Sequence, residues 1–173
     1  MDHYIPKRRI PVTLWSSDLP GLAGSIFLDL DADGNQHQTV LEKLNESSRF
    51  LPVAIGPEGR IHLVNKSRVA RIATGRGVVP GDILARGFRP WREEHVHVLL
   101  ADGVTLAGRL WMPLERETQR VSDFMNQRGS GFFALITAVA VHLVNAAAVV
   151  NIQVSEAAGA PLSGEDEGGQ AAA

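Results

Sequence analysis

Apolar and polar residues alternate along much of this chain in short runs, a pattern that is typical of β-strands. Residues 96–114 (VHVLLADGVTLAGRLWMPL) contain two such runs around Asp102-Gly103. An Asp-Gly pair between apolar runs strongly favours a tight β-hairpin. Further on, Val121, Phe124 and Met125 have the i, i+3, i+4 spacing of one helix face. The pattern therefore predicts a hairpin followed by a short helix.

The same order of patterns occurs in the first half of the chain. Four early stretches align in order with four later ones at offsets of 80 to 84 residues: 12–30 with 96–114, 39–45 with 120–126, 50–55 with 132–137, and 61–72 with 141–152. In the earlier copy, Val40, Leu41 and Leu44 supply the helix face. Ordered self-similarity on this scale indicates an internal duplication.

The most apolar run of the chain covers residues 132–150. It is long enough to span a bilayer as a helix and contains no formal charge. Its counterpart in the first copy, however, contains Glu58, Arg60 and Lys66. A membrane span does not tolerate such charges without partners inside the membrane. We therefore expect a pair of strands here and no membrane span.

Two residue types mark bends within each copy. Asn65 and Asn145 interrupt their apolar runs, and we expect a one-turn corner at each before a last strand. Asparagine suits such a corner because it tolerates left-handed backbone and can bond its own main chain. Gly24 and Gly108 fall inside the second strand of their copies, where glycine commonly marks a bulge or a sharp bend.

Each copy thus predicts the order strand, strand, helix, strand, corner, strand. The stretch VHVLLADGVTLAGRL (96–110) resembles the first motif of Sm proteins, and HLVNKSRVARI (62–72) resembles their second motif. The resemblance implies a mainly β fold of two tandem Sm-like or SH3-like small barrels, and it extends to small uncharacterised bacterial domains. Sm proteins read bases with an acidic residue and an asparagine after the second strand. LERETQR (114–120) and LDADGNQHQ (30–38) replace that loop here, so the resemblance favours the fold and not RNA recognition.

We expect four regions along the chain. They are a first small barrel (1–74), an ordered basic linker (75–94), a second small barrel (95–156) and a disordered acidic tail (157–173). The linker contains six large apolar residues that need cover, so we expect it to pack across both barrels: Val78, Val79, Ile83, Leu84, Phe88 and Trp91. We expect the barrels to be related by a pseudo-twofold axis. The predicted core includes Leu14, Ile26, Leu44, Leu63, Val98, Leu110, Phe124, Leu143 and Val144.

The amino-acid composition excludes several classes of function for this chain. The 173 residues are 45% apolar with a formal charge of −2, which is ordinary for a globular protein. The chain has no cysteine, which excludes disulfides, thiolate metal sites and cysteine nucleophiles. Residues 1–15 contain basic residues without a following apolar segment, so they do not resemble a secretory signal. We expect a cytoplasmic protein.

Two groups of residues resemble metal ligands. Asp29, Asp31 and Asp33 have the spacing with which a calcium loop begins, but its twelfth position holds valine where glutamate is needed. We interpret them as a solvated acidic turn, with calcium binding left as an alternative. His95 and His97 lie on one strand face and could bind zinc. His62 and His142 are equivalent in the two copies, which favours shared packing over chemistry. We expect no metal and no cofactor.

No catalytic motif is present, since the chain lacks both a nucleophile elbow and the lysine of a phosphate loop. We therefore expect no enzyme. From Arg60 to Arg92 the chain has eight basic residues and one acid, whereas residues 156–173 have four acids and no base. We predict a partner-binding segment there: Arg68, Arg71, Arg76, Arg86, Arg89, Trp91 and Arg92. Our interpretation is that a protein partner, with a second copy of the chain as one candidate, docks a segment at an edge or in a shared groove of the duplicated barrels. Weakly selective RNA or DNA binding is the alternative.

Overall fold

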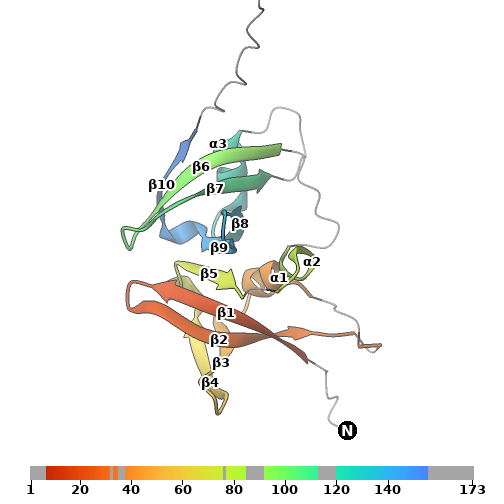
Figure 1. The fold of residues 1–173 in the computed structure, drawn as a ribbon. Helices are drawn as coiled ribbons and strands as arrows, with labels where there is room; N and C mark the ends of the chain where they lie inside the picture. The colour runs from red at the N-terminus through yellow and green to blue at the C-terminus, as the bar shows by residue number, and fades with distance from the viewer. Residues whose placement is uncertain are drawn as a thin grey trace, which may run out of the picture.

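The predicted mainly β fold is confirmed in a computed structural model of the chain, which describes residues 7–31, 33–34, 38–75, 77–84, 92–112 and 120–155. These residues form ten strands, three α-helices and two 3-10 turns, labelled η1 and η2. The strands make one antiparallel sheet that runs through both halves of the chain (Figure 1). The predicted tail and most of the predicted linker's arginines lie outside the described residues.

The first half contains β1 (Lys7–Ser16), β2 (Leu19–Asp29), α1 (Val40–Asn45), β3 (Phe50–Ile55), β4 (Arg60–Asn65), η1 (Lys66–Arg68) and β5 (Arg71–Thr74). After α2 (Pro80–Ile83), the second half contains β6 (Arg92–Leu100), β7 (Thr105–Met112), α3 (Val121–Arg128), β8 (Phe132–Ile136), β9 (Val141–Asn145), η2 (Ala146–Ala148) and β10 (Val149–Val154). The two halves therefore have the same elements in the same order. The helix, the corner and the last strand follow in the predicted order, but each half has two strands between helix and corner, β3 and β4 or β8 and β9, where the predicted order has one.

The sheet has the strand order β10-β6-β7-β8-β9-β5-β1-β2-β3-β4. Equivalent residues have equivalent partners, since Val12 pairs with Gly24 and Thr74 while Val96 pairs with Gly108 and Val154. The halves meet where β5 pairs with β9, and the described strands leave the sheet open at β10 and at β4.

The predicted twofold relation between the halves is wrong. A twofold axis would place the same surface of each half at the junction. Here the last strand of the first half meets the fourth strand of the second, so the junction joins two different surfaces. The halves are arranged head to tail, one above the other in Figure 1.

The local signals of the sequence explain the short helices. Thr39 caps α1, where its hydroxyl accepts a hydrogen bond from Glu42 N and the Glu42 carboxylate accepts one from Thr39 N. The predicted helix faces are confirmed, because Val40, Leu41 and Leu44 are buried in α1, and Val121 and Phe124 in α3. The Asp102-Gly103 turn is confirmed as well, with Gly103 at a φ of +84°.

The asparagine corners form as predicted, but not for both predicted reasons. Asn65 and Asn145 begin η1 and η2, and their side-chain oxygens accept hydrogen bonds from Ser67 N and Ala147 N. Their φ values of −71° and −74° are not left-handed. Bonding to the main chain is therefore what selects asparagine at the corners.

The strand glycines allow a close approach of neighbouring strands. A Cβ at Gly24 would lie 2.8 Å from the Ala54 carbonyl oxygen, and one at Gly108 would lie 2.7 Å from the Ile136 oxygen. The register shift in β1 occurs instead beside Leu14, opposite the start of β2. The predicted bulge at Gly24 is therefore absent from this described ladder, and the glycine provides space for a backbone.

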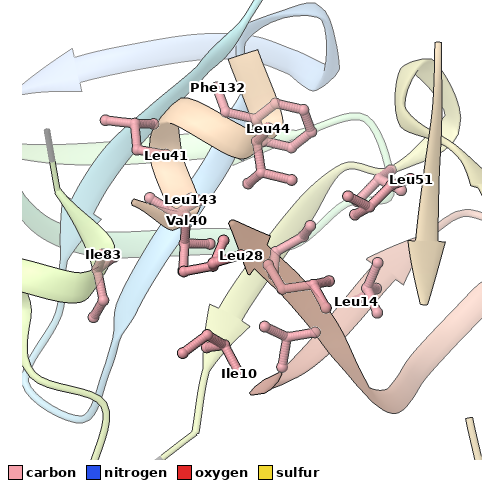
Figure 2. Packing of buried hydrophobic residues seen from close by; sticks show 14 of the residues in the cluster. Ile10, Leu14, Leu28, Val40, Leu41, Leu44, Leu51, Ile83, Phe132 and Leu143 are labelled. Carbon is pink, nitrogen blue, oxygen red and sulfur yellow. The ribbon is translucent and has the colours of Figure 1, made fainter. Parts of the chain in front are cut away.

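The interior consists of two apolar clusters. The first joins the first half to Phe132, Ala134 and Leu143 of the second half, as Figure 2 shows for Phe132 and Leu143. The second cluster lies within the second half around Phe133 and Leu135. Ile83 and Leu84 of the linker are buried in the first cluster, whereas Val79 is exposed, so the cover predicted for Val79 is wrong.

Eight of the nine predicted core residues are buried, and the exception is Leu63, whose exposed fraction is 67%. Leu63 lies on β4 at the open end of the sheet, where none of the described strands lies beyond it. The run 132–150 forms strands β8 and β9, η2 and the start of β10, as expected. No helix among the described residues is both long and apolar enough to cross a membrane.

Candidate functional site at the junction and the open sheet edges

The junction between the halves shows how an edge of this sheet is covered. In β5, Arg71, Ile72 and Ala73 pair with Val144, Leu143 and His142 of β9. Ile72 and Leu143 are both fully buried in the first apolar cluster. The pairing thus combines backbone hydrogen bonding with apolar cover on one face, which is how strands in a sheet stabilise each other.

Two asparagines fasten the junction. The Asn145 side chain donates to Val69 O at 2.9 Å and to Lys66 O at 3.3 Å, and its backbone N donates to Ala70 O at 2.9 Å. On the helix side, Asn45 binds the backbone of Phe132 twice: its amide donates to the carbonyl at 3.0 Å, and its oxygen accepts from the N–H at 2.8 Å. These two asparagines therefore satisfy backbone polar groups across the junction, whereas Arg71 Nε and His142 Nδ1 are buried there without a hydrogen-bond partner among the described residues.

An aromatic and cationic group spans the β5–β9 pairing, in which Arg71 pairs with Val144 at one end and His142 pairs with Ala73 at the other. The Arg71 guanidinium carbon lies 4.0 Å from the centroid of a Trp15 ring, and the His142 ring centroid lies 6.2 Å from that of Trp15. Burial and, to a smaller extent, the charge of Arg71 together lower the pKa of His142 to about 4. His142 is therefore neutral at physiological pH and cannot act there as a cation.

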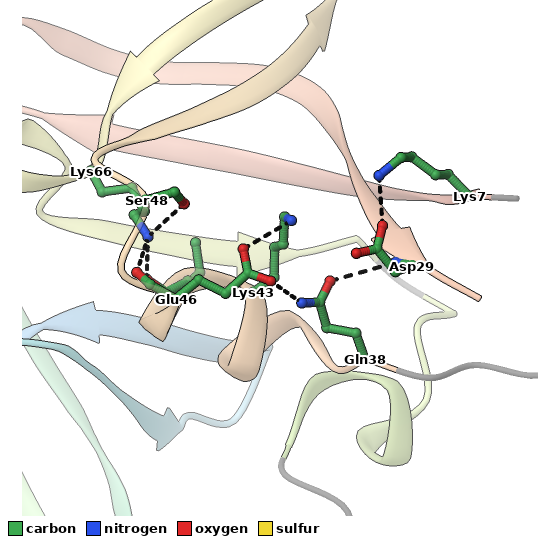
Figure 3. A network of polar contacts seen from close by, with 8 residues as sticks. Lys7, Asp29, Gln38, Lys43, Glu46, Ser48 and Lys66 are labelled. Carbon is green, nitrogen blue, oxygen red and sulfur yellow. Dashed lines mark hydrogen bonds and ion pairs between the residues drawn. The ribbon is translucent and has the colours of Figure 1, made fainter. Parts of the chain in front are cut away.

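A groove of about 360 Å³ runs along the junction between the end of α1 and the corner of η2, with Lys66 and Arg49 in its lining. Lys66 is not available to a ligand. Its ammonium group donates to Leu44 O at 3.1 Å, Glu46 O at 2.6 Å and Ser48 Oγ at 3.4 Å. Burial lowers the pKa of Lys66, partly offset by Glu46. Figure 3 shows this group as part of a chain of polar contacts from Lys7 to η1.

The open edges of the sheet carry most of the large apolar side chains that the described residues leave exposed. Phe50, Ile61 and Leu63 lie on β3 and β4, and Val150 and Val154 lie on β10. Sequence reasoning predicted docking at a sheet edge or groove but did not identify these residues. The signal that could have found them is the repeat itself, because two units joined in line must leave one edge of each without a partner.

The predicted partner-binding segment is only partly described, since Arg76, Arg86, Arg89 and Trp91 lie outside the described residues. The structure does not bring the other three into one cluster. Arg68 is exposed on η1 and pairs with Asp18 at 3.3 Å. Arg71 stacks on Trp15 in the junction, and Arg92 pairs with Glu94 on β6.

The metal candidates have other contacts. Asp29 pairs with Lys7 at 2.6 Å, and Asp31 accepts a hydrogen bond from Asp33 N. His97 Nδ1 lies 3.2 Å from Ser155 Oγ. Within the described ranges, no group of three or more His, Asp or Glu side chains could hold a metal ion. The prediction that His62 and His142 have the same packing is wrong within a single chain, because His142 is buried and His62 is exposed on β4.

Comparisons with known proteins give no functional assignment: no family model, no curated protein and no solved structure matches the chain.

Proposed function

We propose that the chain is a tandem duplication of one Sm-like or SH3-like small-barrel unit, and that it acts without catalysis as an interaction or scaffold protein of the cytoplasm. A partner docks by adding a strand to an open edge of the sheet. The observation that carries this proposal is the row of exposed apolar side chains on the terminal strands, where Leu63 is 67% exposed.

The duplication is supported by register as well as by order. Gly24 and Gly108 approach the next strand at equivalent carbonyls, and both corners begin with an asparagine that binds the main chain two residues on. Phe50 pairs with Asn65 just as Phe132 pairs with Asn145. Such agreement at equivalent positions is what one unit used twice would produce.

Strand addition is supported by the chemistry of the edge. A terminal strand exposes a row of unpaired N–H and C=O groups, and proteins that avoid pairing there place charges or prolines on it. On β4, the three consecutive residues Ile61, His62 and Leu63 are all exposed, and none has a permanently charged side chain. An extended segment of a protein can bind such an edge through its main chain, with side-chain specificity from the apolar residues.

Nucleic-acid binding remains the alternative, and the described arginines favour it less. Arg68 and Arg92 face carboxylates of Asp18 and Glu94, and Arg71 lies against Trp15 in the junction. Arginine pairs readily with carboxylate-rich protein surfaces as well as with phosphate. The basic segment is therefore proposed as part of a protein-binding surface.

Capture from the native lysate tests the proposal. The full chain is immobilised as wild type, as the edge variants Leu63→Lys and Val150→Lys, and as the control Val139→Lys, which changes an exposed valine away from both terminal strands. We expect a different protein to survive nuclease treatment on wild type and control and to be lost from an edge variant. Capture that nuclease abolishes, together with oligonucleotide binding that falls steeply with salt, would overturn it.

A further inference from the structure

The junction inside the chain defines an interface that the open edges can repeat. β5 of the first half and β9 of the second half pair in a known register, with Ile72 opposite Leu143. At the offset of 80 residues found in the sequence, β10 is equivalent to β5 and β4 is equivalent to β9. Neither β10 nor β4 has a partner on its outer side among the described strands.

Apolar residues that the junction buries are exposed at the equivalent edge. Leu143 is 0% exposed and its equivalent Leu63 is 67% exposed, while Phe132 is 3% exposed and its equivalent Phe50 is 46% exposed. The third member, Ala134, is buried, and its equivalent Pro52 is exposed. In the first apolar cluster these three residues of the second half complete a core that belongs mainly to the first half.

Among the described residues, the second cluster lacks such a completion. It contains residues of β6 to β9 and α3, with Ile152 of β10 packed against it as a partly buried residue. Ile152 is equivalent to Ile72, which is fully buried and pairs with Leu143. Leu63 of another copy is therefore the side chain that would cover Ile152, with Phe50 and Pro52 beside it.

The polar contacts of the junction also have equivalents. Asn145 donates its side-chain amide to Lys66 O and Val69 O, which correspond to Ala146 and Val149. Asn65, the equivalent of Asn145, accepts hydrogen bonds from Ser67 in the described structure, and no donation from its amide is seen there. Its amide thus has the geometry to bind the η2 corner of another copy.

Two positions differ, and they limit how closely the second interface can follow the first. Gly131 leaves room for Asn45, because a Cβ there would lie 2.9 Å from Asn45 Oδ1, and its equivalent is Arg49. Asn126, the equivalent of Asn45, must therefore take another rotamer. Val150 replaces the buried Ala70 and adds apolar surface. Strand pairing and apolar contacts would therefore stabilise the interface between copies, without a contribution from Asn126.

From this equivalence, and resting on the proposed function of strand docking, we propose that the occupant of the open edges is a second copy of this chain, added head to tail. β10 of one copy pairs with β4 of the next, which places Asn151, Ile152 and Gln153 opposite Val64, Leu63 and His62. Because each copy keeps one edge of each kind, the assembly continues beyond two copies unless it closes into a ring.

The test is the mass in solution, by light scattering and sedimentation, of the full chain and three variants. Leu63→Lys and Val150→Lys each place a charge on one edge at an exposed position, and Val139→Lys is the matched control. We expect wild type and control to form assemblies of several copies, and each edge variant to be a monomer with affinity reduced about a hundredfold or more. Thermal melts establish that the variants are folded.

Mixing the two edge variants tests the head-to-tail direction. The Leu63→Lys chain keeps a native β10 and the Val150→Lys chain keeps a native β4, so the mixture should form a complex with one chain of each and grow no further. If Val150→Lys assembles by itself while Leu63→Lys does not, the copies pair β4 to β4 and the proposal is wrong.

A wild-type chain that stays monomeric up to about 100 μM, a range in which an interface of this kind should associate, overturns the proposal. Capture from the lysate separates this failure from that of the proposed function. If a different protein is still captured through Leu63 or Val150 by a monomeric chain, strand docking stands and only self-assembly fails. If neither occurs, both proposals fail.

Discussion

The sequence His-Leu-Val-Asn occurs twice in this chain, at 62–65 and at 142–145, with the same local structure and opposite surroundings. Both copies end a strand and begin a 3-10 corner. At 142–145 the strand is covered by β5, and its leucine is 0% exposed, whereas the leucine at 62–65 is 67% exposed. The comparison shows that neighbouring strands, and not local sequence, determine burial in this sheet.

The largest difference should appear when the same charge is placed on both leucines. Leu143→Lys buries an unpaired ammonium in the first cluster and should lower the free energy of unfolding by about 3–5 kcal/mol. Leu63→Lys should change it by less than about 0.5 kcal/mol in dilute protein, because the side chain is in solvent. Urea unfolding of both variants measures the difference. Equal losses would mean that β4 is covered within the chain.

The two histidines should differ in their effect on acid stability. The pKa of His142 is lowered from 6.5 to about 4 by burial and then by Arg71. The unfolded chain therefore binds a proton between these values that the folded chain does not. The part of the free energy of unfolding that depends on neutral His142 is fully present above pH 6.5. It is lost as the pH falls towards 4, and the loss amounts to up to about 3 kcal/mol.

Replacing each histidine by glutamine isolates this contribution. His142→Gln should flatten the fall in unfolding free energy between pH 6.5 and 4, while His62→Gln, which changes the equivalent exposed residue, should leave the fall as it is in the wild type. The measurement is denaturant unfolding at a series of pH values. The same slope in all three proteins would contradict the burial of His142.

The corner asparagines should differ by a smaller amount. Asn145→Asp keeps the oxygen that binds Ala147 N but replaces the amide donor facing two carbonyl oxygens, so we expect a loss of about 2 kcal/mol. Asn65→Asp keeps its bond to Ser67 N and should change the stability of the dilute chain by less than about 0.5 kcal/mol. Thermal unfolding at low concentration compares them, and a loss at Asn65 as large as at Asn145 would show that both corners are already bound.

Much of the fold could be predicted because its signals are local. Asp102-Gly103, the spacing of Val121 and Phe124, and the corner asparagines each act through residues close to them in sequence. The head-to-tail junction and the exposure of Leu63 could not be predicted in this way, because an identical tetrapeptide is used in both surroundings. Which strand covers a given edge depends on how the halves are joined, and the repeat alone permits more than one arrangement.

The residues of the candidate site were missed for the same physical reason. The charge pattern predicted that the arginines bind the partner, but Arg71 lies in the junction and Arg68 pairs with Asp18 on the surface. Phe50 and Leu63 have the sequence pattern of core residues, because their equivalents Phe132 and Leu143 are buried in the core. A strand edge that binds a partner has the same apolar composition as a core strand, so composition does not distinguish an interface from a core.

Hydrogen exchange of the wild-type chain at increasing protein concentration tests the central claim most directly. Amides of β5 and β9 should exchange slowly at every concentration, since they are paired within the chain. Amides on the outer sides of β4 and β10 should exchange fast in dilute protein and become protected together as the concentration rises. Outer amides of β4 and β10 that exchange at a rate independent of concentration, whether fast or slow, would contradict it.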